Sequence, residues 1–260
     1  MEISSEAKPF GGDVDYAVHG LNYSAIRQTD PRIAAMVHGA LGDARTVLNV
    51  GAGAGSYEPL DRYVLAIDPS PTMRAQRSPH QTPAIHGFAE DLPLDGQSVD
   101  AAMAMVTIHQ WSDLEKGIAE LRRVTRGPIV ILTFDGDELD RFWLSEYAPD
   151  LIQAERRRYP KMDRLRNLLG GATVEAIKIP IDCTDGFTEA FYARPERFLE
   201  ESVRRSQSAW SFLEPEVEER IVKRLRRDLE SGEWERRYGE WRSRPCFEGS
   251  LRLVVGRGNA

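Results

Sequence analysis

The sequence predicts an α/β fold with a doubly wound, mostly parallel sheet. Between residues 44 and 135, short apolar runs alternate with amphipathic stretches of helical length. A cluster of glycines directly follows the first apolar run, and two more strand-like runs stand late in the chain. Strands that alternate with helices form βαβ units with right-handed crossovers. We therefore expect a ligand crevice at the carboxyl ends of the parallel strands.

Seven segments are predicted as strands, because they are short and apolar or alternate between apolar and polar residues. Five of them precede residue 135 and two follow residue 170. They are residues 46–50, 63–67, 84–87, 99–105, 128–134, 172–181 and 247–255.

Three segments predict amphipathic helices. Residues 31–41 follow Asp30, a good N-cap, and start with a proline, which suits the first helical position. Residues 114–124 and 215–229 carry apolar side chains at helical spacing. The last of these helices lies within residues 183–245, a stretch rich in charge and aromatic residues, which we interpret as a helical insertion. The glycine cluster is also expected to lead into a helix.

Composition restricts the function classes. A chain of 260 residues can bury a substantial core without metals or disulfides. The two cysteines, Cys183 and Cys246, are far apart and form no CxxC pair, which favours a reducing compartment. The net charge of −7 gives no support to nucleic-acid binding. The N-terminus lacks the pattern of a signal peptide, and no apolar run approaches the ~18 residues of a membrane span, so we expect a cytoplasmic protein that does not bind membranes.

The strongest chemical signal is the run VLNVGAGAG at residues 47–55. Glycines there permit positive φ angles and a close approach of the backbone to a ligand. Alone, this run is ambiguous: Ser56 stands where a nicotinamide-binding GxGxxG motif has its third glycine, and a tight turn without a ligand is equally compatible. Asp68 ends the next predicted strand, where a carboxylate can accept hydrogen bonds from both hydroxyls of a ribose.

Five stretches, taken in order, resemble the successive motifs of class I S-adenosylmethionine (SAM)-dependent methyltransferases, with the "type 11" small-molecule group as the closest match. They are VLNVGAGAGSYEP, VLAIDPSPTMRAQ, GFAEDLPLDGQSVDAAMAM, IHQW and GPIVILTFD. The resemblance covers roughly residues 20 to 135, and the two late strands fit the usual final antiparallel pair. It implies a Rossmann-like, seven-stranded sheet, with SAM as cofactor and S-adenosylhomocysteine (SAH) as product.

The resemblance also implies a division of the chain. Residues 1–30 would cover the cofactor, residues 31–182 and 246–260 would form the SAM-binding core, and residues 183–245 would form an insertion or lid beside the acceptor. The glycines would line the methionine part of SAM, Asp68 would hold the ribose, and Glu90 would lie near the adenine amine. The implied cofactor-binding residues are Tyr23, Arg27, Asn49, Gly51, Ala52, Gly53, Gly55, Asp68, Pro69, Met73, Phe88, Ala89, Glu90, Met105 and Val106. Asn49 and Phe88 depart from the family pattern, which often has acidic residues at these positions.

Methyl transfer is an in-line displacement that mainly requires alignment of the acceptor and exclusion of water. No metal is expected. His109 is the candidate general base, because it follows the fourth predicted strand at the mouth of the crevice. An equally open interpretation is that His109 and Trp111 only shape a turn. Trp111, Phe142, Trp143 and Tyr147 are the candidate acceptor-binding residues, although aromatic residues of this segment and of the insertion also suit a small core.

The expected function is therefore transfer of a methyl group from SAM to an oxygen, nitrogen or carbon atom of a small molecule. A non-catalytic module that binds SAM or SAH is the alternative. An NAD-dependent oxidoreductase is less favoured, because the third glycine of its motif and a separate catalytic constellation are missing. The oligomeric state is left open.

Overall fold

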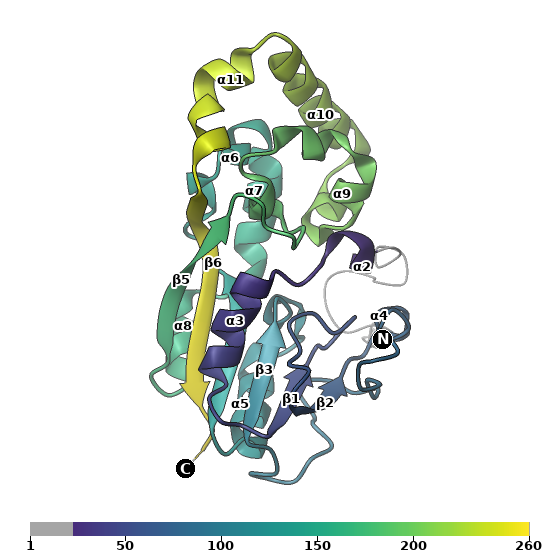
Figure 1. Cartoon of the computed structure of the whole chain (residues 1–260), viewed down its shortest axis with the longest axis vertical. Coiled ribbons are helices and arrows are strands. Elements are labelled where there is room, and N and C mark those ends of the chain that lie inside the picture. Colours follow the sequence, from purple (N-terminus) through teal and green to yellow (C-terminus); the bar gives the residue numbers. More distant parts are fainter. Residues whose placement is uncertain (1–22, 260) are drawn as a thin grey trace, which may run out of the picture.

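The structure, a computed structural model, describes residues 23–259 and contains one mixed sheet flanked by helices, with a helical region at one end (Figure 1). The sheet has six strands in the order β2-β1-β3-β4-β6-β5. The strands are β1 (Thr46–Val50), β2 (Tyr63–Ile67), β3 (Ala101–Met105), β4 (Pro128–Phe134), β5 (Thr173–Pro180) and β6 (Cys246–Arg257). The first four are parallel to one another, and β6 runs antiparallel to both β4 and β5. The predicted mostly parallel sheet with a final antiparallel pair is confirmed.

The predicted seventh strand, residues 84–87, is reduced to a single bridge between Ile67 and Ile85. Ile85 donates its N–H to Ala66 O at 2.9 Å, and Ile85 O accepts the N–H of Asp68 at 3.1 Å. The segment is only four residues long, and Ile85 is 55% exposed. Too little apolar surface is buried there to extend the pairing, so the sheet of the described chain has six strands.

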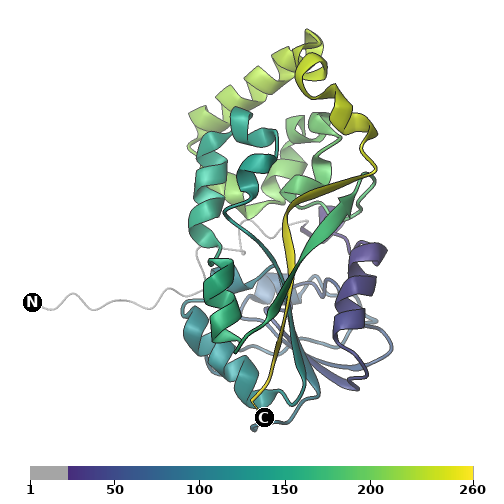
Figure 2. The ribbon, with the colours of Figure 1, turned by 90° about the vertical axis from the view of Figure 1, so that its left-hand side faces the viewer.

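Both faces of the sheet are covered, as Figure 2 shows. Along β4, Val130, Leu132 and Phe134 pack in one buried cluster, whereas Ile129 and Ile131 pack in the other. The first cluster includes α3 (Pro31–Ala40), and the second includes α5 (Leu114–Val124) and α8 (Met162–Leu168). The side chain of Asp30 accepts the N–H of Arg32 at 3.0 Å, which confirms the predicted N-cap of α3.

The helical region at one end combines segments from before and after β5. Its first part follows β4 and contains η2 (Leu139–Arg141), α6 (Leu144–Tyr147) and α7 (Pro149–Arg158). Its second part lies between β5 and β6 and contains η3 (Thr188–Phe191), η4 (Pro195–Leu199), α9 (Glu201–Arg205), η5 (Ser208–Phe212), α10 (Pro215–Glu230), α11 (Glu233–Tyr238) and η6 (Gly239–Ser243). Helix α10 confirms the helix predicted from residue 215.

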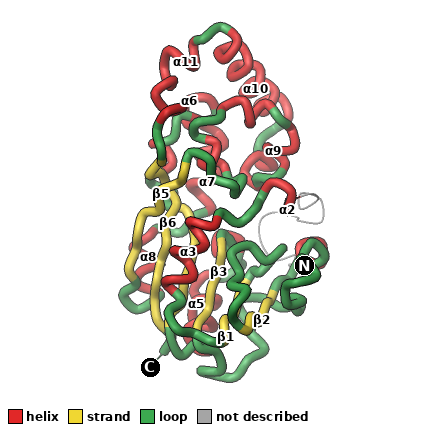
Figure 3. Tube along the Cα trace, in the orientation of Figure 1, coloured by secondary structure: helices red, strands yellow, loops and turns green. Residues whose placement is uncertain are grey.

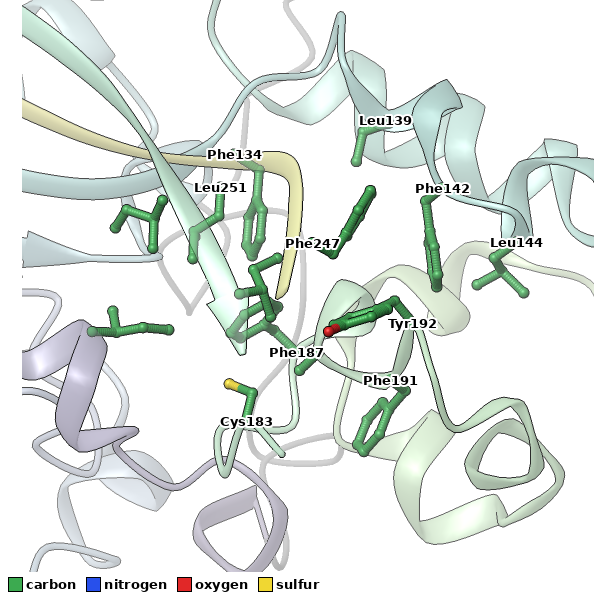
Figure 4. Close-up of a cluster of buried hydrophobic side chains, with 14 of the residues drawn as sticks. Phe134, Leu139, Phe142, Leu144, Cys183, Phe187, Phe191, Tyr192, Phe247 and Leu251 are labelled. Carbon is green, nitrogen blue, oxygen red and sulfur yellow. The ribbon is translucent and has the colours of Figure 1, made fainter. Parts of the chain in front are cut away.

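This helical region shares one hydrophobic core with a face of the sheet. The same buried cluster contains Phe134 of β4, Phe142, and Trp234 of α11. Figure 4 shows part of it, with aromatic side chains from β4, β6 and the segment after β5 packed together. Two of the remaining short elements, α4 (Pro71–Arg74) and η1 (Ile108–Gln110), lie in the connections that leave the carboxyl ends of β2 and β3. The third, α2 (Tyr23–Ile26), precedes α3.

The helix expected after the glycines is absent. Residues 51–62 form turns between β1 and β2, visible as a loop in Figure 3. Only residues 56–62 separate Gly55 from β2, and Pro59 lacks the N–H that a helix interior needs. Tyr57 has a φ of 64°, which also excludes a right-handed helix at this point.

Candidate active site

Two adjacent cavities lie at the carboxyl ends of the parallel strands. The first encloses about 870 Å³, its open mouth included. It is lined by the glycine loop, the end of β2, the segment at residues 87–90 and the end of β3. Its lining residues are Gly51, Ala52, Gly53, Ala54, Ser56, Asp68, Pro69, Ser70, Met73, Gly87, Phe88, Ala89, Glu90, Met105, Val106, Thr107, Gln110, Trp111 and Ser112.

The glycine loop brings bare backbone to the wall of the first cavity. Gly51 has a φ of 69°, and a Cβ at this position would lie 2.1 Å from Thr107 Oγ1. The N–H groups of Gly51 and Ala52 both donate to Ile67 O, at 2.9 and 3.0 Å. Both the conformation and the close approach of Thr107 therefore require glycine at position 51.

Asp68 forms the polar centre of the first cavity. It is 6% exposed, and its two oxygens accept the N–H groups of Gly53 at 2.7 Å and Ser70 at 2.8 Å. Burial raises the pKa of Asp68, while these two hydrogen bonds act in the opposite direction. The carboxyl group is thus held in one orientation, and its remaining acceptor positions are available to a ligand.

The second cavity lies between the sheet and the helical region and encloses about 640 Å³, its mouth included. Most of its wall is apolar. Its lining residues are Arg27, Val106, His109, Gln110, Phe134, Leu139, Phe142, Leu151, Ile152, Glu155, Tyr159, Phe187, Thr188, Glu189, Gln207, Ser208 and Ala209. Val106 and Gln110 line both cavities, so these two residues form their shared wall.

Val106 holds an unusual backbone conformation at this shared wall. Its φ is 51°, in the left-handed region that β-branched residues rarely adopt. Its N–H donates to Leu132 O at 2.7 Å, which continues the pairing of β3 with β4 by one residue. Such strain costs of the order of 1–3 kcal/mol and is typical of functional sites.

His109 lies in the wall of the second cavity. Its ring makes an edge-to-face contact with Tyr159, with the centroids 4.8 Å apart. Among the described residues, Nδ1 is buried without a hydrogen-bond partner, while Nε2 lies 3.3 Å from Nε2 of Gln110. Burial lowers the pKa of His109 well below its ordinary value, and the charges of Arg158 and Arg27 lower it further. The ring is therefore neutral at pH 7.

Comparison with known proteins identifies the family. Residues 48–128 match a family model described as a methyltransferase domain. The crystal structure of a putative methyltransferase from an antibiotic biosynthesis pathway of Anabaena variabilis superimposes with a TM-score of 0.84 and 32% identity, covering 90% of this chain and 99% of that one. The chain belongs to the class I SAM-dependent methyltransferases. Its cofactor is SAM.

Two curated relatives match over shorter stretches. An uncharacterized methyltransferase of Mycobacterium bovis is 41% identical over 91 residues, which cover 32% of this chain and 36% of that protein. The chloroplastic 2-methyl-6-phytyl-1,4-hydroquinone methyltransferase 2 of rice is 30% identical over 118 residues, covering 40% of this chain and 33% of that protein. The chain thus matches about a third of the length of these relatives.

The first cavity of this methyltransferase fits SAM in its chemistry. Bare glycine backbone, a fixed carboxyl group at Asp68 and the buried side chain of Met73 offer contacts to a charged amino acid part, a ribose and a flat base. Glu90 is held by Ser112 Oγ and the Asp113 N–H, both donating to its Oε1 at 2.8 and 3.0 Å.

Several predicted residues lie elsewhere than the resemblance implied. Gly55 and Asn49 do not line the first cavity; Asn49 is buried below the loop and donates to Glu58 at 2.9 Å. Trp111, predicted for the acceptor site, lines the first cavity. Tyr23 begins α2, but its side chain, like residues 1–22 of the predicted covering arm, lies outside the described part of the chain.

Arg27 lines the second cavity and not the first. Its Nε donates to Asp185 at 2.6 Å, and the same carboxylate accepts the hydroxyl of Tyr57 at 2.8 Å. The isolated bridge between Arg27 and Asp185 places the end of α2 beside the segment after β5. These contacts connect the glycine loop, α2 and the second cavity.

Of the predicted acceptor residues, only Phe142 lines the second cavity. Trp143 and Tyr147 line neither cavity. Trp143 Nε1 donates to Tyr192 O at 2.8 Å, and the Tyr147 hydroxyl donates to Asp228 at 3.1 Å, so both are turned into the core of the helical region. After β4, some aromatic side chains face the second cavity and others face the core of the helical region, and the sequence spacing did not distinguish the two groups.

Sequence reasoning also missed a buried pair that holds the glycine loop and several residues that line the second cavity. Arg77 pairs with Glu58 at 2.6 Å, and this buried pair ties the glycine loop to the segment after α4. Glu155, Tyr159, Glu189 and Gln207 line the second cavity. Each stands among charged or apolar residues in helical or irregular sequence, where no motif marks it.

No group of three or more metal-ligating side chains occurs within residues 23–259, and no helix in that range is long and apolar enough to cross a membrane.

Proposed function

We propose that this methyltransferase transfers the methyl group of SAM to a small molecule bound in the second cavity. One observation carries the proposal: Val106 and Gln110 line both cavities, so the cofactor and acceptor spaces meet at one shared wall. The rice relative, whose name specifies a hydroquinone substrate, adds support for a small-molecule acceptor.

SAM supplies a methyl group made electrophilic by a positively charged sulfur. We propose that Asp68 holds the ribose and that the glycine loop receives the methionine part of SAM. Met73, Phe88 and Ala89 would surround the adenine, with Glu90 near its amino group. The second cavity would hold the acceptor against the shared wall and exclude water, which provides much of the required rate by proximity.

His109 is the proposed base for an acceptor that must lose a proton. It lines the second cavity beside the shared-wall residue Gln110, and its neutral imidazole has one unprotonated nitrogen. A positioned base of this kind typically contributes about 10²–10⁴-fold to the rate.

Replacing one alanine in each cavity by phenylalanine tests the two-cavity arrangement. Ala209 lines the second cavity and Ala54 the first. Ala209→Phe should leave the SAH dissociation constant within about twofold and abolish methyl transfer, because the added ring fills the acceptor space. Ala54→Phe should weaken SAH binding at least tenfold. Binding is measured by isothermal titration, and transfer by a screen of small acceptors with methyl-labelled SAM.

The screen of the wild-type protein also separates the proposal from a non-catalytic module. A protein that binds SAM but transfers label to no small acceptor would contradict the proposed function. Full transfer by Ala209→Phe, with a melting temperature equal to that of the wild type, would show that the acceptor binds elsewhere.

A further inference from the structure

We propose that Glu189 is the acceptor-recognition residue of the second cavity. The acceptor we infer is an uncharged aromatic compound that carries a hydroxyl or amino group as hydrogen-bond donor. This assignment rests on the proposed function, because it takes the second cavity as the acceptor site.

Glu189 presents a buried carboxyl group with few partners. It belongs to η3, is 1% exposed and lines the second cavity. Both of its oxygens lie 3.0 Å from one backbone donor, the N–H of Ser250 in β6. Within residues 23–259 it forms no salt bridge. A carboxylate offers about four acceptor positions, so most of its hydrogen-bonding capacity is unused.

The surrounding backbone is shaped to admit this carboxyl group. Gly249 precedes Ser250, and a Cβ at Gly249 would lie 2.6 Å from Glu189 Oε1. Burial raises the pKa of Glu189 to about 7, although the backbone N–H and the side-chain hydroxyl of Ser250 and the charges of Arg252 and Arg141 act to lower it. A buried polar group with unused capacity is costly, and a donor on a ligand would remove that cost.

Nδ1 of His109 has no partner among the described residues, but three other polar side chains of the cavity are engaged within the protein. The Tyr159 hydroxyl donates to Glu155 at 2.7 Å. The hydroxyl of Thr188 donates to the Gln207 side chain at 2.9 Å, and the Gln207 amide nitrogen donates to Gly186 O at 3.3 Å. Glu189 therefore holds the largest share of unused acceptor capacity among these groups.

The charges around the cavity disfavour an anionic acceptor. Arg27, the cation in its wall, is paired with Asp185 at 2.6 Å. Glu155 is paired with Arg158, also at 2.6 Å. Because these cations are neutralised and Glu189 adds a further acidic group, a phosphate or carboxylate would enter without a compensating charge.

The apolar wall suits a flat ring. Phe134 lies 5.4 Å from Tyr159 and 5.5 Å from Phe187, measured between ring centroids, so the rings run continuously from the neighbour of His109 to the start of η3. Figure 4 shows Phe134, Phe142 and Phe187 in this cluster. Stacked and edge contacts with aromatic ligands are favourable in such surroundings.

The test uses three compounds that share one ring system: 2-naphthol, 2-naphthylamine and 2-naphthyl phosphate. Each is titrated calorimetrically into the full chain saturated with SAH. We expect the naphthol and the amine to bind the wild type, and the phosphate to bind at least tenfold more weakly. Glu189→Leu should weaken naphthol binding tenfold or more, whereas Glu189→Gln should retain much of it, because its amide oxygen still accepts a hydrogen bond.

Asp228→Asn is the matched control, because Asp228 is also buried and acidic but lines neither cavity. It should bind naphthol as the wild type does. SAH affinity and melting temperature report whether each variant is folded. Wild-type naphthol affinity in Glu189→Leu, equal affinity for the phosphate, or no binding of any naphthalene compound would each overturn the assignment.

Methyl transfer from labelled SAM is measured in parallel with binding. If naphthol binding depends on Glu189 but no acceptor is ever methylated, the proposed function fails and the recognition role of Glu189 stands. If methyl transfer occurs to other acceptors and naphthol binding does not depend on Glu189, the proposed function stands and the recognition role of Glu189 fails.

Discussion

Three buried ionisable side chains at the two cavities differ in what surrounds them. Asp68 receives two backbone N–H groups, which fix its orientation. His109 faces an aromatic ring and is kept neutral by burial. Glu189 shares one N–H between its two oxygens. From these surroundings we propose a fixed acceptor for ribose at Asp68, a base at His109 and a recognition group at Glu189.

His109→Gln tests the proposed base at this scale. The substitution keeps a polar side chain of similar length but removes the basic nitrogen. For an acceptor that must lose a proton, kcat should fall by about 10²-fold or more, with the SAH dissociation constant unchanged. Steady-state kinetics and calorimetry measure the two quantities. Full turnover with unchanged cofactor affinity would show that His109 only shapes the turn.

The same variant provides a control for the neutral state of the ring. Because the folded pKa of His109 is lowered, only the unfolded chain takes up this proton as the pH falls through about 6.5. The free energy of unfolding of the wild type, relative to His109→Gln, should therefore decrease between pH 7.5 and 5.5. Urea unfolding at both pH values measures it, and parallel curves would contradict a neutral buried ring.

At the scale of elements, the loop between β1 and β2 replaces an expected helix. Its positive φ angles and its contacts with Thr107 and Ile67 keep the glycine backbone at the cavity wall. The buried pair Arg77–Glu58 holds the loop from the other side, and Arg77 also donates to Gly53 O at 3.2 Å. The loop is thus fixed by side chains and backbone contacts and not by a helix of its own.

Gly51→Ala should therefore both destabilise the protein and weaken cofactor binding. The new methyl group would clash with Thr107 Oγ1, and the alanine would have to adopt a φ of 69°. We expect a loss of at least about 1–3 kcal/mol in the free energy of unfolding, measured in urea, and SAH binding at least tenfold weaker.

Gly39→Ala is the matched control, since Gly39 lies inside α3 with nothing within 4 Å of its Cβ position. It should gain roughly 0.5–1 kcal/mol, because alanine favours a helix over glycine. An equal effect of both substitutions would show that the loop tolerates a side chain at position 51.

The elements that could be predicted from the sequence are those whose buried residues follow a local pattern of apolar residues or begin at a recognisable cap. β1, β2 and β4 are apolar runs, α3 begins at a polar cap and a proline, and α10 repeats an apolar residue every four positions. The strand predicted at residues 84–87 and the helix predicted after Gly55 were wrong. The local sequence pattern does not show how many residues a connection has for a helix, or how much apolar surface the neighbouring elements bury.

The first cavity was predictable in outline for a similar reason: its residues stand in motifs along consecutive strands. The second cavity was not. Arg27, Tyr159 and Glu189 reach it from three segments far apart in sequence, and their meeting depends on tertiary packing. Trp143 and Tyr147 looked equivalent to Phe142 in sequence but face the core.

At the scale of the whole molecule, the sheet and the helical region depend on one hydrophobic core. The cluster that contains Met103 of β3 also contains Trp143 and Trp234, whose rings lie 5.4 Å apart in an edge-to-face contact. The division into core and insertion stays a proposal. Because of this shared cluster, we expect the two parts to unfold together.

Trp143→Ala tests that expectation. Deletion of a fully buried tryptophan should lower the free energy of unfolding by about 3–5 kcal/mol. Wild type and variant should each unfold in a single transition, with circular dichroism and tryptophan fluorescence coincident in urea. The SAH dissociation constant of the folded variant should equal that of the wild type, because Trp143 lines neither cavity. Two separate transitions would show that the helical region is an independent unit.

The left-handed backbone conformation of Val106 leads to an expectation about which residues homologues carry at this position. At this φ of 51°, glycine or asparagine would be accommodated with less strain, so mutation and drift alone should replace the valine. A branched side chain can persist there only under selection for what it does at the shared wall. Among homologues that retain both cavities, we therefore expect a branched apolar residue at this position, and glycine where the second cavity has been lost.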